Sequence, residues 1–189
     1  MKPEGATVDY KVVSKGSNFV VRAYAAGLLS AFGHNPTIAI PDFEGTIVLN
    51  PDAVEQSSLR LVIQSASLAV SDDISKADRD DINHRMHNEV LESDSFPEIE
   101  YECSRLSASK TAEGQYWAAL NGELSLHGVT RSQPISARIS VNGDTLRATG
   151  DFSIRQSDYQ IRPVSAMGGA VRLKDDLKLS FDISARRQA

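Results

Sequence analysis

Apolar and polar residues alternate along most of this chain. Segments 43–49, 99–103 and 177–183 each carry an apolar or glycine residue at every second position. A period of two is typical of antiparallel strands with one buried face. Turn-forming residues separate the alternating runs, as at 14–17, and Asn142-Gly143 is a strong hairpin signal because alternation flanks it on both sides. The pattern predicts about eight or nine strands.

Two segments depart from simple alternation. The apolar positions of segment 59–70 change face midway, which predicts a β-bulge or a second covered face. Segment 78–91 predicts the one convincing helix, because its apolar residues form a single stripe consisting of Ile82, Met86, Val90 and Leu91. Alternation also fails at 27–33, where we expect a short helical turn.

Many short strands joined by hairpin turns indicate either a β-sandwich or a closed barrel. We favour an eight-stranded antiparallel barrel with one amphipathic helix packed against it, because closure removes exposed strand edges. The 189 residues are most simply one domain, 1–189. Such a barrel either fills with its own side chains or holds a small ligand. Aromatic residues make up only 6% of the chain, and many strand positions carry small residues, among them Ala23, Ala137 and Ala148.

Charge and cysteine content narrow the function classes. The chain has 25 acidic and 20 basic residues and no lysine or arginine run, which disfavours a nucleic-acid surface and strong electrostatic docking to anionic lipid. No apolar run is long enough to span a bilayer. Residues 1–10 lack the apolar core of a signal peptide, so we expect a cytoplasmic protein, with the periplasm as the alternative if a signal has been removed. The single cysteine, Cys103, excludes an internal disulfide.

Histidines are the best candidates for chemistry. His84 and His87 are spaced so that a helix could bring both to one metal ion, but no third ligand lies nearby in sequence, and we favour a solvated helix face. His34 either caps a turn or contacts a ligand head group. His127 falls at a hairpin corner, where we expect it to bond a loop carbonyl. The sequence has no Gly-x-Ser-x-Gly elbow and no P-loop or dinucleotide fingerprint.

Four stretches, taken in order, resemble the YceI-like family: FGHNPTIAIPDFEGTI, RDDINHRMHNEVLESDSFPEIEYEC, GELSLHGVTRSQPI and GDFSIRQSDYQI. The resemblance as a whole covers roughly residues 18–186, and the four stretches lie between residues 32 and 161. The resemblance implies a lipocalin-like barrel that binds a long isoprenoid, such as an isoprenoid quinone, or a similar amphipathic lipid in an elongated cavity, and it is compatible with a homodimer. The sequence departs from the family at Gln156, where arginine is usual, and at Gln160, where glycine is usual.

We therefore expect a protein that binds and sequesters or transports an isoprenoid-like lipid, without enzymatic activity, cofactor or metal. The alternatives are a metal-assisted enzyme using its histidines and a filled barrel that serves as a stress or interaction module. Alternation predicts that the ligand contacts Phe19, Val21, Phe43, Ile47, Leu61, Ile99, Tyr101, Leu124, Leu126, Phe152, Ile154, Leu179 and Phe181. The predicted rim residues, which would orient a head group, are His34, Arg155, Asp158 and Tyr159.

Overall fold

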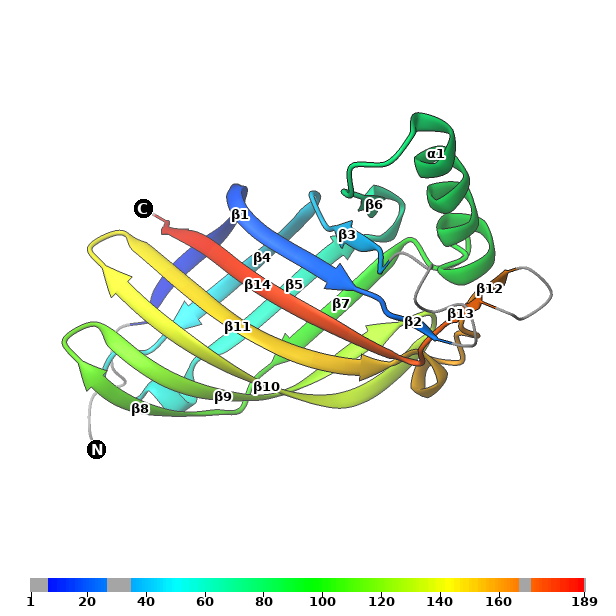
Figure 1. Ribbon diagram of the computed structural model, residues 1–189. Helices are drawn as coiled ribbons and strands as arrows, with labels where there is room; N and C mark the ends of the chain where they lie inside the picture. The colour runs from blue at the N-terminus through cyan, green and yellow to red at the C-terminus, as the bar shows by residue number, and fades with distance from the viewer. Residues whose placement is uncertain (1–6, 27–34, 167–170, 189) are drawn as a thin grey trace.

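The computed structural model describes residues 7–26, 35–166 and 171–188, and its main feature is a closed antiparallel barrel (Figure 1). Eight strands pair in a ring, and the ring closes where the last strand pairs with the first. In order around the barrel the strands are β14 (Asp176–Arg187), β11 (Thr145–Arg155), β10 (Val129–Asn142), β9 (Gln115–Leu126), β7 (Glu98–Cys103), β5 (Ser58–Gln64), β4 (Phe43–Leu49) and β1 (Val8–Arg22). The predicted eight-stranded barrel is confirmed.

Tight turns join β9 to β10 and β10 to β11. Asn142 pairs with Thr145, so the predicted hairpin is confirmed, and Gly143 takes a positive φ of 56° in its two-residue turn. Residues 14–17 do not form the expected turn. They lie inside β1 as a bulge, where the register with β14 shifts between Val13 and Asn18. Gly16, at φ 90°, allows this kink without ending the strand.

The face change in segment 59–70 does not come from a bulge. The alternative, a second covered face, is borne out near the end of β5, where Leu61, Val62 and Ile63 are all buried, and a turn follows directly. Strand β5 ends at Gln64, and a 3-10 turn, Ser65–Ser67, redirects the chain before the short strand β6 (Ala69–Val70). Ser65 fixes this turn, since its N–H donates to Pro97 O at 2.8 Å and its hydroxyl donates to Phe96 O at 2.8 Å. The alternation restarts because β6 leaves the barrel and pairs with β3 (Thr37–Ala39).

The predicted helix is confirmed, with an earlier start and a wider last turn. Helix α1 (Lys76–Arg85) begins after Ser75, whose hydroxyl oxygen accepts a hydrogen bond from the Asp78 N–H at 3.1 Å. A π-helical turn, Met86–Val90, follows directly. The wider turn lets both Met86 and Leu91 lie buried against the barrel.

One end of the barrel is covered by elements outside the ring. Figure 1 shows α1 and β6 at this end, together with a small sheet made of β2 (Ala25–Ala26), β13 (Val171–Leu173) and β12 (Ser165–Ala166). At the opposite end β8 (Leu106–Ala112) extends the line of β7 and pairs with β9. The barrel therefore has one end covered by the helix and the small sheet, called here the helix end.

Candidate functional site

The interior of the barrel contains an apolar cavity of about 490 Å³. All eight strands of the ring contribute lining residues, because alternate side chains of each strand point inward. The apolar stripe of the helical segment also lines the cavity, through Ile82, Met86, Val90 and Leu91. Small residues leave part of this space, since Ala23, Ala137 and Ala148 are among the lining residues.

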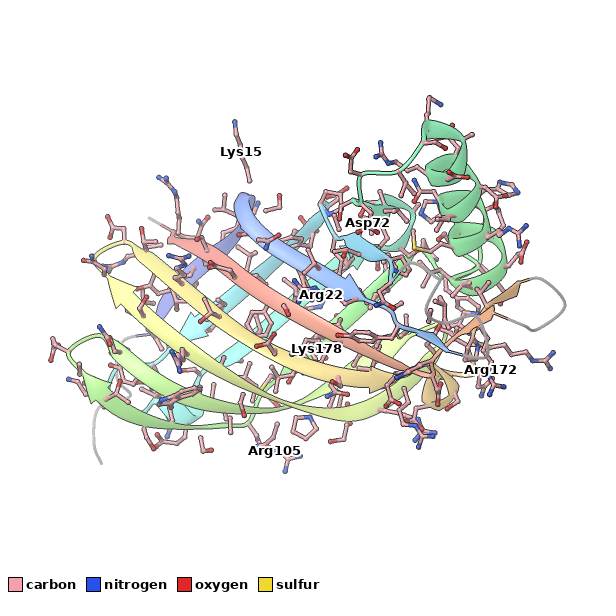
Figure 2. The ribbon with its side chains drawn as sticks, viewed as in Figure 1. Lys15, Arg22, Asp72, Arg105, Arg172 and Lys178 are labelled. Atoms are coloured by element: carbon pink, nitrogen blue, oxygen red, sulfur yellow. The ribbon has the colours of Figure 1, made fainter. Side chains whose placement is uncertain are left out.

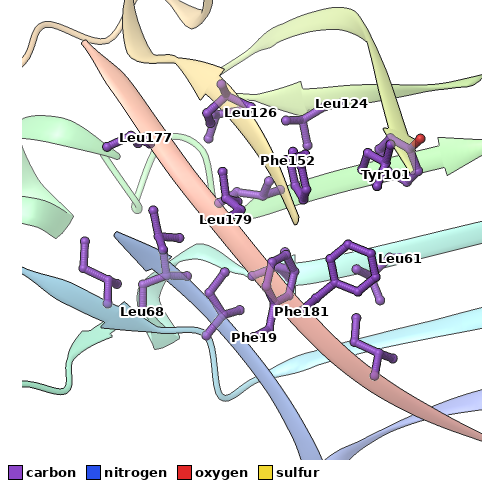
Figure 3. Close-up of a pocket in the computed structure, with 18 of the residues that line it drawn as sticks. Phe19, Leu61, Leu68, Tyr101, Leu124, Leu126, Phe152, Leu177, Leu179 and Phe181 are labelled. Atoms are coloured by element: carbon purple, nitrogen blue, oxygen red, sulfur yellow. The ribbon is translucent and has the colours of Figure 1, made fainter. Parts of the chain in front are cut away.

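Twelve of the thirteen residues that alternation predicted to contact a ligand lie on the wall of this cavity, and Figure 3 shows how several of them face one another across it. The exception is Phe43. It is buried at the start of β4 but packs edge-on against Phe19, with ring centroids 6.1 Å apart, and does not reach the cavity. Contact of the other twelve with a ligand stays a prediction.

Glycines on the inner face make room for the largest side chains. A Cβ at Gly150 would lie 2.7 Å from the ring of Phe181, its direct cross-strand neighbour. A Cβ at Gly122 would lie 2.5 Å from the hydroxyl of Tyr101. Replacing either glycine would displace an aromatic wall residue, so the glycines help define the shape of the cavity.

Tyr101 carries the one polar group in the middle of the apolar wall, and this group is already satisfied. Its hydroxyl donates to Gln133 O at 3.0 Å, within the wall of the barrel. Burial raises the pKa of the Tyr101 hydroxyl well above its ordinary value, so the side chain stays neutral. The central part of the cavity therefore offers a ligand almost exclusively apolar contacts.

Polar lining residues gather at the two ends of the cavity. Ser57, Ser58 and Tyr116 line it where β5 and β9 begin, away from the helix. At the helix end it is lined by Arg85 of α1, Gln156 after β11, and Arg172 of β13. Neither arginine was predicted to line the cavity, because neither α1 nor a three-residue strand has an alternation that would mark a position as inward.

The predicted rim residues do not line the cavity in the described structure. Arg155, Asp158 and Tyr159 border a second pocket, which is lined by both polar and apolar side chains. Arg155 forms an ion pair with Asp175, at 3.2 Å between Nε and Oδ2, and the backbone oxygen of Asp158 accepts from Arg131 Nε at 2.6 Å. Tyr159 is buried. His34 lies outside the described residues. A head-group role for these four residues stays a prediction.

The helical histidines make local hydrogen bonds. His84 lies on an exposed face, where its Nδ1 is 3.1 Å from the side-chain amide of Asn88. His87 departs from the expected solvated position, because its ring is partly buried and its Nε2 donates to Leu68 O at 2.7 Å. No group of three or more potential metal-ligating side chains of His, Cys, Asp or Glu occurs among the residues that the structure describes.

His127 has the structural role that its hairpin position predicted. It forms a two-residue turn with Gly128 between β9 and β10, and both residues have positive φ, 52° and 74°. Its Nδ1 donates to the backbone oxygen of Tyr159 at 3.3 Å, which confirms the expected bond to a loop carbonyl. Phe96 packs on the ring, with centroids 4.4 Å apart.

This chain is similar to UPF0312 proteins of Pseudomonas. A UPF0312 protein from Pseudomonas syringae pv. tomato is 26% identical over 141 residues, which make up 75% of this chain and 66% of that protein. A UPF0312 protein from Pseudomonas savastanoi pv. phaseolicola matches to the same extent. The chain thus spans 66% of the length of these relatives.

Within the described part of the chain, no helix has the length and apolar character needed to cross a bilayer.

Solved structures with the same fold cover most of the chain. BcnA from Burkholderia cenocepacia has a TM-score of 0.69 at 15% identity, covering 92% of this chain and 98% of BcnA. A polyisoprenoid binding domain from Saccharophagus degradans also has a TM-score of 0.69, at 12% identity, covering 95% of this chain and 98% of that domain. The YceI protein of Campylobacter jejuni has a TM-score of 0.60 at 16% identity, covering 83% of this chain and 88% of that protein.

The model of the YceI-like domain matches residues 10–185, which contain all eight ring strands except the ends of β1 and β14. Because this match covers most of the chain, the protein belongs to the YceI-like family.

Proposed function

We propose that this protein binds one lipid with a long apolar tail, of the isoprenoid type, inside the barrel and acts as its carrier or reservoir. The observation that carries the proposal is the apolar cavity enclosed by all eight strands. The similarity in fold to the Saccharophagus degradans polyisoprenoid binding domain supports the choice of ligand class. The filled-barrel alternative does not account for a cavity of about 490 Å³.

Energetics favour reversible binding over permanent capture. Each CH₂ group moved from water into the cavity contributes about 0.8 kcal/mol, so a long tail binds strongly relative to water. The membrane is an equally apolar competitor, and the net preference for the protein is therefore only a few kcal/mol, set by fit and by polar contacts. A ligand held in this balance can be taken up from a bilayer and returned to one.

The proposed role requires no bond to be made or broken, and we propose that the protein is not an enzyme. His87 and His127 support this assignment because their ring nitrogens bond Leu68 O, Tyr159 O and the carboxylate of Glu92. The metal-assisted alternative finds no favouring observation among the described residues.

A bulky residue inside the cavity tests the proposal. Leu126 is buried on the wall, and Leu126→Trp should occupy space that the tail needs. Glu123, on the same strand but exposed, supplies the control variant Glu123→Trp. Binding of geranylgeraniol to delipidated protein, measured by thermal stabilisation, should be lost in Leu126→Trp and kept in the control.

Two results would contradict the proposal. One is wild-type protein that geranylgeraniol does not stabilise. The other is Leu126→Trp protein that is folded by circular dichroism and is stabilised as strongly as the wild type. The circular dichroism measurement separates a blocked cavity from a general loss of structure.

A further inference from the structure

Two residues that line the cavity at the helix end are both exposed to solvent and positively charged. Arg85 and Arg172 are the only exposed residues among those described as lining the cavity, and both lie at the helix end. The described lining contains no aspartate or glutamate. The undescribed segments 27–34 and 167–170 contain no acidic residue in their sequence either. Among the described lining residues, those exposed to solvent are therefore two arginines.

Arg172 is available to a ligand. It is exposed on β13, where its backbone pairs with Ala26 of β2, and no carboxylate among the described residues forms an ion pair with it. Figure 2 shows Arg172 at the end of the barrel beside β13. Because it also lines the cavity, its aliphatic stem contacts apolar surface while the charged group reaches water.

Arg85 of α1 supplies a second cation to the cavity lining. Its Nε lies 3.1 Å from Asp81 Oδ2, within the helix. This contact uses one edge of the guanidinium, and the planar group has further N–H donors. Arginine presents such donors in a fixed fork that suits carboxylate and phosphate oxygens.

Gln156 adds a buried hydrogen-bonding group to the same end of the cavity. Its side chain is almost fully buried yet lines the cavity. Its amide nitrogen donates to Lys174 O at 2.9 Å, which fixes the orientation of the group. The amide oxygen can accept a hydrogen bond, so a protonated oxygen of a head group has a partner there.

We propose that the bound lipid carries an anionic oxygen head group, a phosphate or a carboxylate, held at the helix end by Arg172 and Arg85 with its tail along the barrel. This inference rests on the proposed lipid-binding function and specifies the ligand class for that site. A neutral head group would leave Arg172 without an anionic partner among the described residues.

Three probes with the same prenyl tail test the inference: geranylgeranyl monophosphate, geranylgeranoic acid and geranylgeraniol. The tail contributes equally to all three, so differences in affinity report the head group. We expect delipidated wild-type protein to bind the two anionic probes several-fold more tightly than the alcohol, roughly three- to tenfold. This advantage should shrink at high salt, while binding of the alcohol stays unchanged. The ratio of the two anionic probes distinguishes a phosphate from a carboxylate ligand.

Arg172→Gln assigns the effect to this residue, and Arg105→Gln is the matched control. Arg105 is exposed, does not line the cavity, and lies away from Arg172 in Figure 2. Its substitution changes the net charge by the same amount as Arg172→Gln but leaves the cavity lining unchanged. Arg172→Gln should remove most of the anionic advantage, Arg172→Lys should keep part of it, and Arg105→Gln should keep all of it. The melting temperature of each free variant checks that it is folded.

The outcomes separate this inference from the proposed function. Equal binding of all three probes by the wild type, or an anionic advantage that survives Arg172→Gln in full, overturns the head-group assignment and leaves lipid binding intact. No binding of any probe overturns the proposed function itself.

Discussion

His127 and Glu92 form a hydrogen bond that joins the β9–β10 turn to the segment after the helix, with 2.6 Å between Nε2 and Oε2. Both residues have positive φ, 52° and 47°. Gln160, the third non-glycine residue with positive φ among those described, follows Tyr159, whose backbone oxygen accepts from the same His127 ring. The His127 ring is therefore hydrogen-bonded to Glu92 and to Tyr159, the residue before Gln160. It links three segments that each contain a residue with an unfavourable positive φ.

Removing this imidazole should destabilise the protein. His127→Ala loses both hydrogen bonds and the packing on Phe96 and keeps a side chain in the left-handed region, so we expect the free energy of unfolding to fall by about 1–3 kcal/mol. His127→Gly loses the same contacts without the backbone strain and should lose about 1 kcal/mol less. Urea denaturation measures both values. If both variants have the same free energy of unfolding as the wild type, the His127 contacts do not stabilise the protein and the prediction is wrong.

Much of the fold could be predicted because burial on one face leaves a period of two in the sequence. The segments around Leu179 and Leu124 were assigned to strands on this basis, and both residues lie on the cavity wall. The helix could be predicted for the same reason, since Ile82 and Met86 pack against the barrel with helical spacing. The local sequence pattern was sufficient to predict those strands and the helix, because each has one face packed against the core.

Other features depend on contacts between distant segments, which alternation does not encode. Phe43 has the inward pattern, but Phe19 of another strand lies against it and it does not reach the cavity. Arg172 belongs to a three-residue strand whose partners are β2 and β12. Gln156 could be singled out only as a departure from the family pattern, and its place on the cavity wall needed the three-dimensional structure.

Low pH should destabilise the 3-10 turn Gln156–Tyr159, which follows β11. The hydroxyl and backbone N–H of Ser157 donate to Asp175 at 2.6 and 2.7 Å, and with Arg155 they hold the pKa of the Asp175 carboxyl below its ordinary value. A lowered folded-state pKa gives stability that is present above the unfolded-state pKa, about 4, and is lost as the pH falls through the folded-state value.

Asp175→Asn should therefore be less stable than the wild type at pH 7, and the difference should narrow below about pH 4. Ser157→Ala, which removes the hydroxyl donor, should show the same trend to a smaller extent. Urea denaturation at a series of pH values measures both. A stability difference that stays constant across the acid range would refute the linkage.

Gly122 should be intolerant of any side chain. A Cβ there would lie 2.4 Å from the backbone oxygen of Glu102 and 2.5 Å from the Tyr101 hydroxyl, so either the β7–β9 pairing or the Tyr101 ring must shift. We expect Gly122→Ala to lower the free energy of unfolding by about 1–3 kcal/mol. Glu123→Ala is the control, because Glu123 is exposed on the same strand. Equal stability of the two variants in urea denaturation would contradict this account of the wall.

Recovery of lipid from a membrane tests the central claim most directly. Delipidated protein would be incubated with vesicles made from total bacterial lipid, separated from them, extracted with organic solvent, and its extract analysed by mass spectrometry. We predict that the wild type and Glu123→Trp carry a lipid with a long prenyl tail and that Leu126→Trp does not. Wild-type protein that returns without lipid, or Leu126→Trp protein that returns with as much, would contradict the account.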